Sequence, residues 1–338
     1  MKRRRLMRIV IAYDGSAGAE LALEHLCRRR AGLPEMAKVR VLAVADQFTL
    51  IPEWTPGDLD GAPFQAQEIA EITRQSAAET RRRMKDTAEK AMRRLRKNLP
   101  HWSVEAKVCT GSAAQEMLAE AKEWRADLVV LGWRGQRKLA RWLLGSVAQQ
   151  VLNEAPCSVR IVRGSIGKLG APVCLVIGVD GTAAADAAVR AMAQRRWPRG
   201  STARIVSVVD WGGVWLPPSS DLSSVFWAEV QQRQMRWLTQ LANQASRDLQ
   251  RSGLAVRAVV KRGDAKQVLA QEAERWDADC LVVGATGVRG LTRLLMGSVA
   301  TAITLRAVCS VEVVRPFQRI SRVRAMGRSE AKRSTILI

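Results

Sequence analysis

The sequence contains few of the side chains on which catalysis most often depends. Among 338 residues there are two histidines and one tyrosine. His25 and His101 are far apart in the sequence, and neither lies in a cysteine–histidine spacing that would hold zinc. No G-x-x-x-x-G-K-[S/T] phosphate loop occurs. A zinc enzyme and a P-loop NTPase are therefore both disfavoured.

The sequence also has few cysteines and no long apolar run. Its six cysteines form no C-x-x-C pair, and several lie within short apolar segments such as 174–177. Such cysteines are usually small buried hydrophobic residues in a reducing compartment. No apolar run reaches the roughly 18 residues of a spanning helix. The run that follows basic residues 2–5 ends before Asp14 and is too short for a signal-peptide core. We therefore expect a cytoplasmic protein without a membrane span.

Acidic residues are scarce relative to basic ones. The chain has 54 Lys and Arg against 32 Asp and Glu, a net charge of +22. With 47% hydrophobic and 25% charged residues, the composition is that of a globular protein with a sizeable core. A charge of this size attracts polyanions whatever the fold. Because no helix-turn-helix, zinc-finger or RNA-recognition signature accompanies it, we expect any such binding to be non-specific.

The chain contains an internal repeat. Residues 10–16 (V-I-A-Y-D-G-S) match residues 176–182 (V-I-G-V-D-G-T) at an offset of 166, and from residue 111 to residue 145 the offset becomes 152. The second copy is therefore shorter in the region that corresponds to 47–70. A repeat of this length is a whole duplicated domain rather than a solenoid unit. We predict one domain at 1–165, a second at 172–316, and a basic mobile tail at 317–338.

Within each copy, short apolar runs alternate with helical patterns. The first copy predicts strands at 7–13, 39–45, 104–108, 128–131 and 158–162, and helices at 17–30, 65–99, 113–124 and 143–153. Continuously apolar strands are typical of a parallel sheet that is covered on both faces. Strand–helix alternation indicates an α/β fold. We therefore predict two doubly wound α/β domains, each with a five-stranded parallel sheet flanked by helices.

A glycine spacing follows the fourth predicted strand of each copy. The pattern is Gly-x2-Gly-x9-Gly-Ser, formed by Gly132, Gly135, Gly145 and Ser146 in the first copy and by Gly284, Gly287, Gly297 and Ser298 in the second. Glycines at the end of a strand let the backbone approach a ligand and adopt positive φ. The helix that begins at the Gly-Ser step offers free N–H groups and the positive end of its dipole. Its serine hydroxyl either caps the helix or contacts a phosphate oxygen.

An aspartate follows the first predicted strand of each copy, at Asp14 and Asp180. Open α/β sheets bind ligands beyond the carboxyl ends of their strands, where the strand order reverses. A carboxylate there accepts hydrogen bonds from ribose hydroxyls or from an adenine amino group. The alternative is that each aspartate only caps the next helix, with Gly-Ser or Gly-Thr completing the turn. Position alone does not decide between them, and the glycine spacing favours the ligand.

These motifs together resemble the universal stress protein family. The Asp-Gly-Ser opening, the glycine loop and the final Pro-Cys-Ser-Val strand carry the resemblance, which covers about 5–163 and 172–315 and matches the tandem form. The loop is that of the ATP-binding branch, so the resemblance implies ATP, with or without Mg²⁺. It assigns the nucleotide contacts to Asp14, Val44, Gly132, Gly135, Gly145, Ser146 and Val147, and in the second copy to Asp180, Val208, Gly284, Gly287, Gly297, Ser298 and Val299.

The sequence departs from the family pattern at three positions. Ala12 and Gly178 stand where many members have proline, and Trp133 enters the first glycine loop, where it could stack on a ligand or block one. The resemblance also implies that the last strands of two domains pair, here 158–162 and 310–314 of one chain. A nine-residue linker spans at most about 30 Å, and an unpaired apolar edge strand is an aggregation hazard. We therefore expect an internal pseudo-dimer, with a homodimer of chains left open.

The leading interpretation is an ATP-binding cytoplasmic stress-response protein with one nucleotide site per repeat. It would act as a nucleotide-dependent switch or as a scaffold for a regulatory protein partner, and no catalytic residue is assigned. One alternative is a weak ATPase or nucleotidyl-handling enzyme of the same α/β superfamily, although no acid–base constellation accompanies the loops. Another is a basic protein that binds nucleic acid or an anionic surface, and it rests on charge alone.

Overall fold

The computed structural model describes residues 6–28, 32–45, 64–133, 144–164, 167–210, 223–285 and 296–316. Its first half contains β1 (Met7–Ala12), α1 (Ala17–Arg28), β2 (Ala37–Ala45), α2 (Phe64–Asn98), β3 (Ser103–Thr110), α3 (Ala113–Glu123), β4 (Leu128–Gly132), α4 (Ser146–Glu154) and β5 (Ser158–Val162). The second half contains β6 (Cys174–Gly178), α5 (Ala183–Ala193), β7 (Thr202–Val209), α6 (Ser223–Gln250), β8 (Ala255–Arg262), α7 (Ala265–Arg275), β9 (Cys280–Gly284), α8 (Ser298–Arg306) and β10 (Ser310–Val314).

The ten strands form one sheet in the order β3-β2-β1-β4-β5-β10-β9-β6-β7-β8. Within each half all neighbours are parallel, and the halves join through the antiparallel pair β5–β10. The prediction of two five-stranded parallel sheets is confirmed, and so is their internal pairing. Predicted element bounds in the first half agree within three residues. The division at 165 and 172 stays a prediction, and the tail 317–338 and most of the stretch 47–70 lie outside the described residues.

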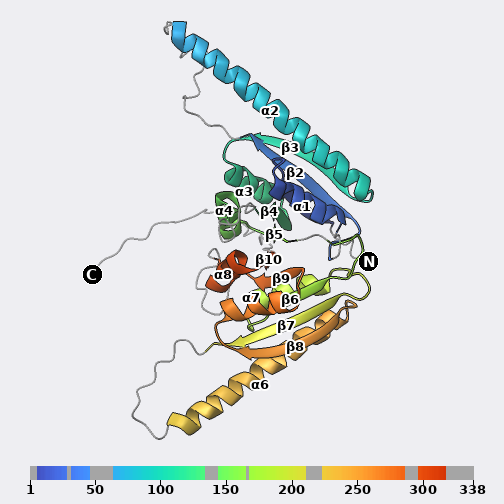
Figure 1. Cartoon of the computed structure of the whole chain (residues 1–338), viewed down its shortest axis with the longest axis vertical. Coiled ribbons are helices and arrows are strands. Elements are labelled where there is room, and N and C mark those ends of the chain that lie inside the picture. Colours follow the sequence, from blue (N-terminus) through green and yellow to red (C-terminus); the bar gives the residue numbers. More distant parts are fainter. Residues whose placement is uncertain are drawn as a thin grey trace, which may run out of the picture.

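Helices cover both faces of the sheet, and the long helices α2 and α6 lie at its two outer ends (Figure 1). On the face of α3, α4, α7 and α8, one apolar core runs continuously from the first half into the second. On the other face there are two separate cores, one beneath α1 and α2 and one beneath α5 and α6. None of the helices in the described part of the chain is long and apolar enough to cross a membrane.

On this second face, buried charged residues lie between the two separate cores. The strand register places Arg160 of β5 opposite Glu312 of β10. Arg160 Nε donates to Glu312 Oε2 at 2.9 Å, and Arg195, just beyond α5, donates to the same oxygen at 2.9 Å. Arg160 Nη1 lies 3.2 Å from His25 Nε2. Because a guanidinium only donates, that ring nitrogen accepts. This role of His25 is not predictable from the sequence, since Arg160 is far away along the chain.

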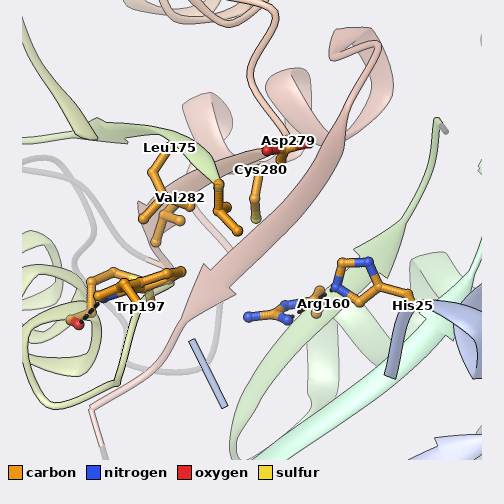
Figure 2. A pocket seen from close by; sticks show the side chains of 9 residues that line it. His25, Arg160, Leu175, Trp197, Asp279, Cys280 and Val282 are labelled. Carbon is orange, nitrogen blue, oxygen red and sulfur yellow. Dashed lines mark hydrogen bonds between the residues drawn. The ribbon is translucent and has the colours of Figure 1, made fainter. Parts of the chain in front are cut away.

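A small cavity lies beside this charged cluster (Figure 2). Its walls include Arg160 and His25 on one side and Trp197 on the other. At about 20 Å³ it has room for about one water molecule. The cavity is therefore a packing gap at the junction of the halves and too small for an organic ligand.

Two further buried carboxylates fix the third helix of each half onto the sheet. Glu120 of α3 accepts from Lys107 Nζ at 2.5 Å and also pairs with Arg40. Glu272 of α7 accepts from Arg204 Nε at 2.6 Å and pairs with Lys261 at 3.2 Å. Burial raises the pKa of each carboxyl, but the paired cations outweigh it and hold the pKa below its usual value.

We expect the Glu312 carboxylate, which lies between the halves, to make the protein less stable in acid. Burial raises the pKa of Glu312, but Arg160 and Arg195 outweigh it and bring the pKa to about 2, against about 4.3 in an unfolded chain. Because the folded-state pKa is the lower one, this stabilisation is complete above about pH 4.3 and disappears as the pH falls from there through 2. Urea unfolding at a series of pH values measures it.

The Glu312→Gln variant isolates this contribution. At pH 6 we expect its free energy of unfolding to be lower by about 3 kcal/mol, because two arginines then lack their carboxylate. Between pH 4.3 and pH 2 its stability should fall less than that of the wild type. The exposed Glu105 serves as control, and Glu105→Gln should follow the wild-type profile. Parallel profiles for wild type and Glu312→Gln would contradict the assignment.

Candidate functional site

The predicted site residues gather at the carboxyl ends of three neighbouring strands in each half. In the first half β1 lies between β2 and β4, so the strand order reverses between β1 and β4. Asp14 follows β1, Val44 lies near the end of β2, and Gly132 ends β4. The second half places Asp180, Val208 and Gly284 in the same way. This is the switch point at which open α/β sheets bind ligands.

In the first half, the aspartate shapes the turn between β1 and α1. Asp14 Oδ1 accepts a hydrogen bond from the Ser16 N–H at 2.9 Å. Gly15 has a φ of +76°, which its lack of a Cβ permits. The Ser16 hydroxyl accepts from the Ala19 N–H at 3.3 Å and so occupies the capping position of α1. The Asp14 side chain is exposed at the edge of the sheet.

The second half builds the same turn more tightly. Asp180 Oδ1 accepts from the Thr182 N–H at 3.0 Å and from its hydroxyl at 2.6 Å. Thr182 is the N-cap of α5 and accepts from the Ala185 N–H at 3.2 Å. In both halves the serine or threonine therefore caps the helix, and the alternative in which the aspartate is the cap is wrong. The aspartate instead orders the turn, which holds its carboxylate at the switch point.

Gly132 and Gly284 have a packing role that the sequence did not reveal. A Cβ on Gly132 would lie 1.8 Å from the carbonyl oxygen of Gly18 in α1. A Cβ on Gly284 would lie 2.5 Å from the carbonyl carbon of Ala184 in α5. The first helix of each half thus packs directly on the backbone of the fourth strand. This contact requires glycine whether or not a ligand is bound.

Gly145 and Gly297 differ from the predicted conformation. Their φ values are −60° and −65° in extended backbone, so the positive φ anticipated for the loop glycines is wrong at these two positions. Each is the N-cap of its helix and has no side chain with which to cap it. Ser146 and Ser298 are the first helical residues, and both are exposed. Within the described residues, the first turns of α4 and α8 therefore lack a side-chain cap.

Some of the remaining predicted site residues lie within the described part of the chain. Val147 and Val299 are half-buried and pack against the continuous core, and Val44 and Val208 do the same from the strand ends. In the second half the Gly297 N–H donates to the carbonyl oxygen of Ala285 at 2.7 Å, which ties the start of α8 to the end of β9. The predicted contacts Gly135 and Gly287 lie outside the described residues.

Trp133 lies in the core rather than open to a ligand. Its side chain is 6% exposed and belongs to the continuous core. The guanidinium carbon of Arg163 lies 3.3 Å from the centre of its ring. Because apolar packing and this cation–π contact already cover the ring, stacking on a ligand is wrong for this arrangement. Ala285 takes the corresponding position in the second half.

The described residues contain no cluster of side chains that would bind a metal ion. No group of three or more His, Cys, Asp or Glu side chains there is arranged to hold a metal ion. Burial raises the pKa of the Cys157, Cys280 and Cys309 thiols to about 12. These thiols are therefore protonated and behave as small hydrophobic residues.

The chain matches the model of the universal stress protein family over residues 6–163 and again over 175–315. Universal stress protein Rv2005c of Mycobacterium tuberculosis is 30% identical over 196 residues, which span 56% of this chain and 62% of that protein. A universal stress protein of Mycolicibacterium smegmatis is 25% identical over 311 residues, which span 91% of this chain and 97% of that protein.

A solved structure shows the same tandem architecture. The crystal structure of a universal stress protein from Archaeoglobus fulgidus covers 91% of this chain and 96% of its own, with a TM-score of 0.56 and 16% identity. At this level of identity the likeness concerns the fold, and it extends over both halves.

The close approach at Gly132 predicts a large loss of stability on substitution. Gly132→Ala places a methyl group against the backbone of α1, and we expect a destabilisation of about 3 kcal/mol from overpacking. Gly170→Ala is the matched control, because its φ is +75° but nothing lies within 4 Å of the added Cβ. It should cost about 1 kcal/mol through backbone strain alone. Equal losses in urea unfolding would show that the contact with α1 is unimportant.

Proposed function

Because the chain belongs to the universal stress protein family, we propose that each of its two domains binds one adenine nucleotide, with ATP as the ligand. Nucleotide occupancy then sets the conformation that a regulatory partner recognises. The proposal gives the protein the role of a stress-response switch and assigns it no catalytic residue.

The observation that carries the proposal is the start of α4 and of α8. Each helix begins at a glycine N-cap, without a side-chain cap among the described residues, at the carboxyl edge of the sheet. The unpaired N–H groups of such a first turn favour an anion, and the positive end of the helix dipole adds to this. The exposed Ser146 and Ser298 hydroxyls are available to phosphate oxygens at the same positions.

The neighbouring strand ends supply groups for the rest of a nucleotide. The carboxylates of Asp14 and Asp180 accept hydrogen bonds, as ribose hydroxyls or an adenine amino group require. Val44 and Val208 are half-buried and offer an apolar surface for the base. Phosphate donors, a carboxylate acceptor and an apolar strand end thus surround each switch point, which is the combination that a nucleotide needs.

The proposal predicts two nucleotides per chain and a separable loss of each. Gly145→Val and Gly297→Val place a branched side chain where the phosphate would lie. Because both glycines have extended φ, valine causes no backbone strain there. The poorer N-cap should lower the free energy of unfolding by about 1 kcal/mol. Calorimetry with ATP and Mg²⁺ should give two sites in the wild type, one in either single variant, and none in the double variant.

The control is the N-cap of another helix at the same edge. Ser112 begins α3 beside the outer strand β3, and it also lacks a side-chain cap hydrogen bond. Ser112→Val should keep both nucleotides. Two-site binding in a folded double variant would refute the phosphate assignment. A wild type that binds no ATP, and releases no nucleotide for mass spectrometry when freshly purified, would refute the function.

A further inference from the structure

We propose that each nucleotide site is positioned by an arginine of the opposite domain, Arg315 for the first site and Arg163 for the second. This inference rests on the proposed function for the identity of the ligand. It makes the two sites mechanically linked across the junction of the halves.

Arg315 follows β10 in the second half but binds the last turn of α4 in the first. Its Nη2 donates to the carbonyl oxygens of Leu152 at 2.5 Å and of Asn153 at 3.2 Å. Its Nη1 lies 3.5 Å from the carbonyl oxygen of Cys157. Its backbone N–H donates to the Ser158 hydroxyl at 3.2 Å, which fixes the residue to β5.

Arg163 follows β5 and makes the equivalent contact in the opposite direction, from the first half to the second. Its guanidinium donates to the carbonyl oxygens of Ala307 and, at 3.3 Å, of Thr304, at the end of α8. Its backbone N–H donates to the Ser310 hydroxyl at 3.2 Å, and that hydroxyl donates to the Arg163 carbonyl at 3.1 Å. Two reciprocal clamps therefore cross the β5–β10 junction.

The clamped helices are those that begin at the proposed phosphate sites. The last carbonyls of a helix have no partner within it, and a cation at that end stabilises the helix dipole. Each of these helices has only nine residues, about 13 Å in length. A short rigid helix transmits a displacement of its last turn to its first. Each arginine thus sets the position of N–H groups that belong to the other domain.

Trp133 makes the linkage unequal. Its ring lies against the Arg163 guanidinium, and the residue itself directly follows Gly132, at the start of the first glycine loop. Arg163 therefore contacts Trp133 of the first half as well as the helix of the second site. Ala285, in the corresponding place, has no ring to offer Arg315. A displacement of Trp133 thus reaches α8 more directly than a displacement of Ala285 reaches α4.

The test measures ATP affinity one site at a time. Gly297→Val leaves the first site and Gly145→Val leaves the second. Added to these backgrounds, Arg315→Gln should weaken ATP binding about tenfold at the first site and less than about twofold at the second, and Arg163→Gln should do the reverse. Trp133→Ala should weaken the second site. Arg315→Lys, which keeps the charge but loses the fork, should restore part of the affinity at the first site.

Arg195→Gln is the matched control. Arg195 binds Glu312 at the same junction but, within the part of the chain that the structure describes, donates no hydrogen bond to α4 or α8. Once folding is verified by thermal melting, it should leave both affinities unchanged. Losses of equal size in all three arginine variants would mean that the junction acts only through stability. Losses in each arginine's own domain, or no losses, would overturn the inference.

Amide hydrogen exchange without nucleotide separates this inference from the proposed function. Arg315→Gln should speed exchange in residues 146–154 and leave 298–306 unchanged, and Arg163→Gln should give the opposite pattern. If the wild type binds no ATP while this crossed pattern holds, the ligand is wrong and the positioning stands. If ATP binds at two sites and exchange is not crossed, the positioning is wrong.

Discussion

The antiparallel contact between β5 and β10 is the constraint on which the rest of the structure depends. It converts two five-stranded sheets into one sheet of ten strands, and it decides what each face contains. On one face Val159 and Ile161 of β5 and Val311 and Val313 of β10 join a single core. On the other, the same alternation of side chains brings Arg160 and Glu312 together in a buried ion pair. A buried pair is costly unless its members are fully hydrogen-bonded, and here Arg195 and His25 complete the bonding.

This contact also explains how the two switch points are arranged. The strands that end beside them lie only one or two places from the junction. The residues that follow β5 and β10 therefore reach the last helix of the opposite half. The sheet edge carries the groups proposed to bind the nucleotide, and residues at the junction contact the helices that begin beside those groups. Neither half contains both elements alone.

The sequence predicts much of this fold because its signals are local. Short apolar runs predicted β5 and β10 to the residue, and the family resemblance implied that they would pair. The sequence did not distinguish the role of Gly132 from that of Gly145. Both belong to one spacing, yet Gly132 is needed for contact with α1, whereas Gly145 is an N-cap in ordinary extended backbone. Only the approach of a helix distant in sequence distinguishes them. For the same reason the ion pair between residues 160 and 312 was not predictable from the sequence, because only the strand register brings the two residues together.

Because of the buried ion pair, two identical halves could not form this interface with each other. Residues 160 and 312 occupy equivalent positions in the two repeats, but one is a cation and the other an anion. If two first halves met through β5 in the same register, two guanidiniums would face each other in a dry site without a carboxylate. If two second halves met through β10, both β5 edges would be left uncovered. The duplicated halves have thus become unlike components that complement each other, and neither can replace the other as a partner.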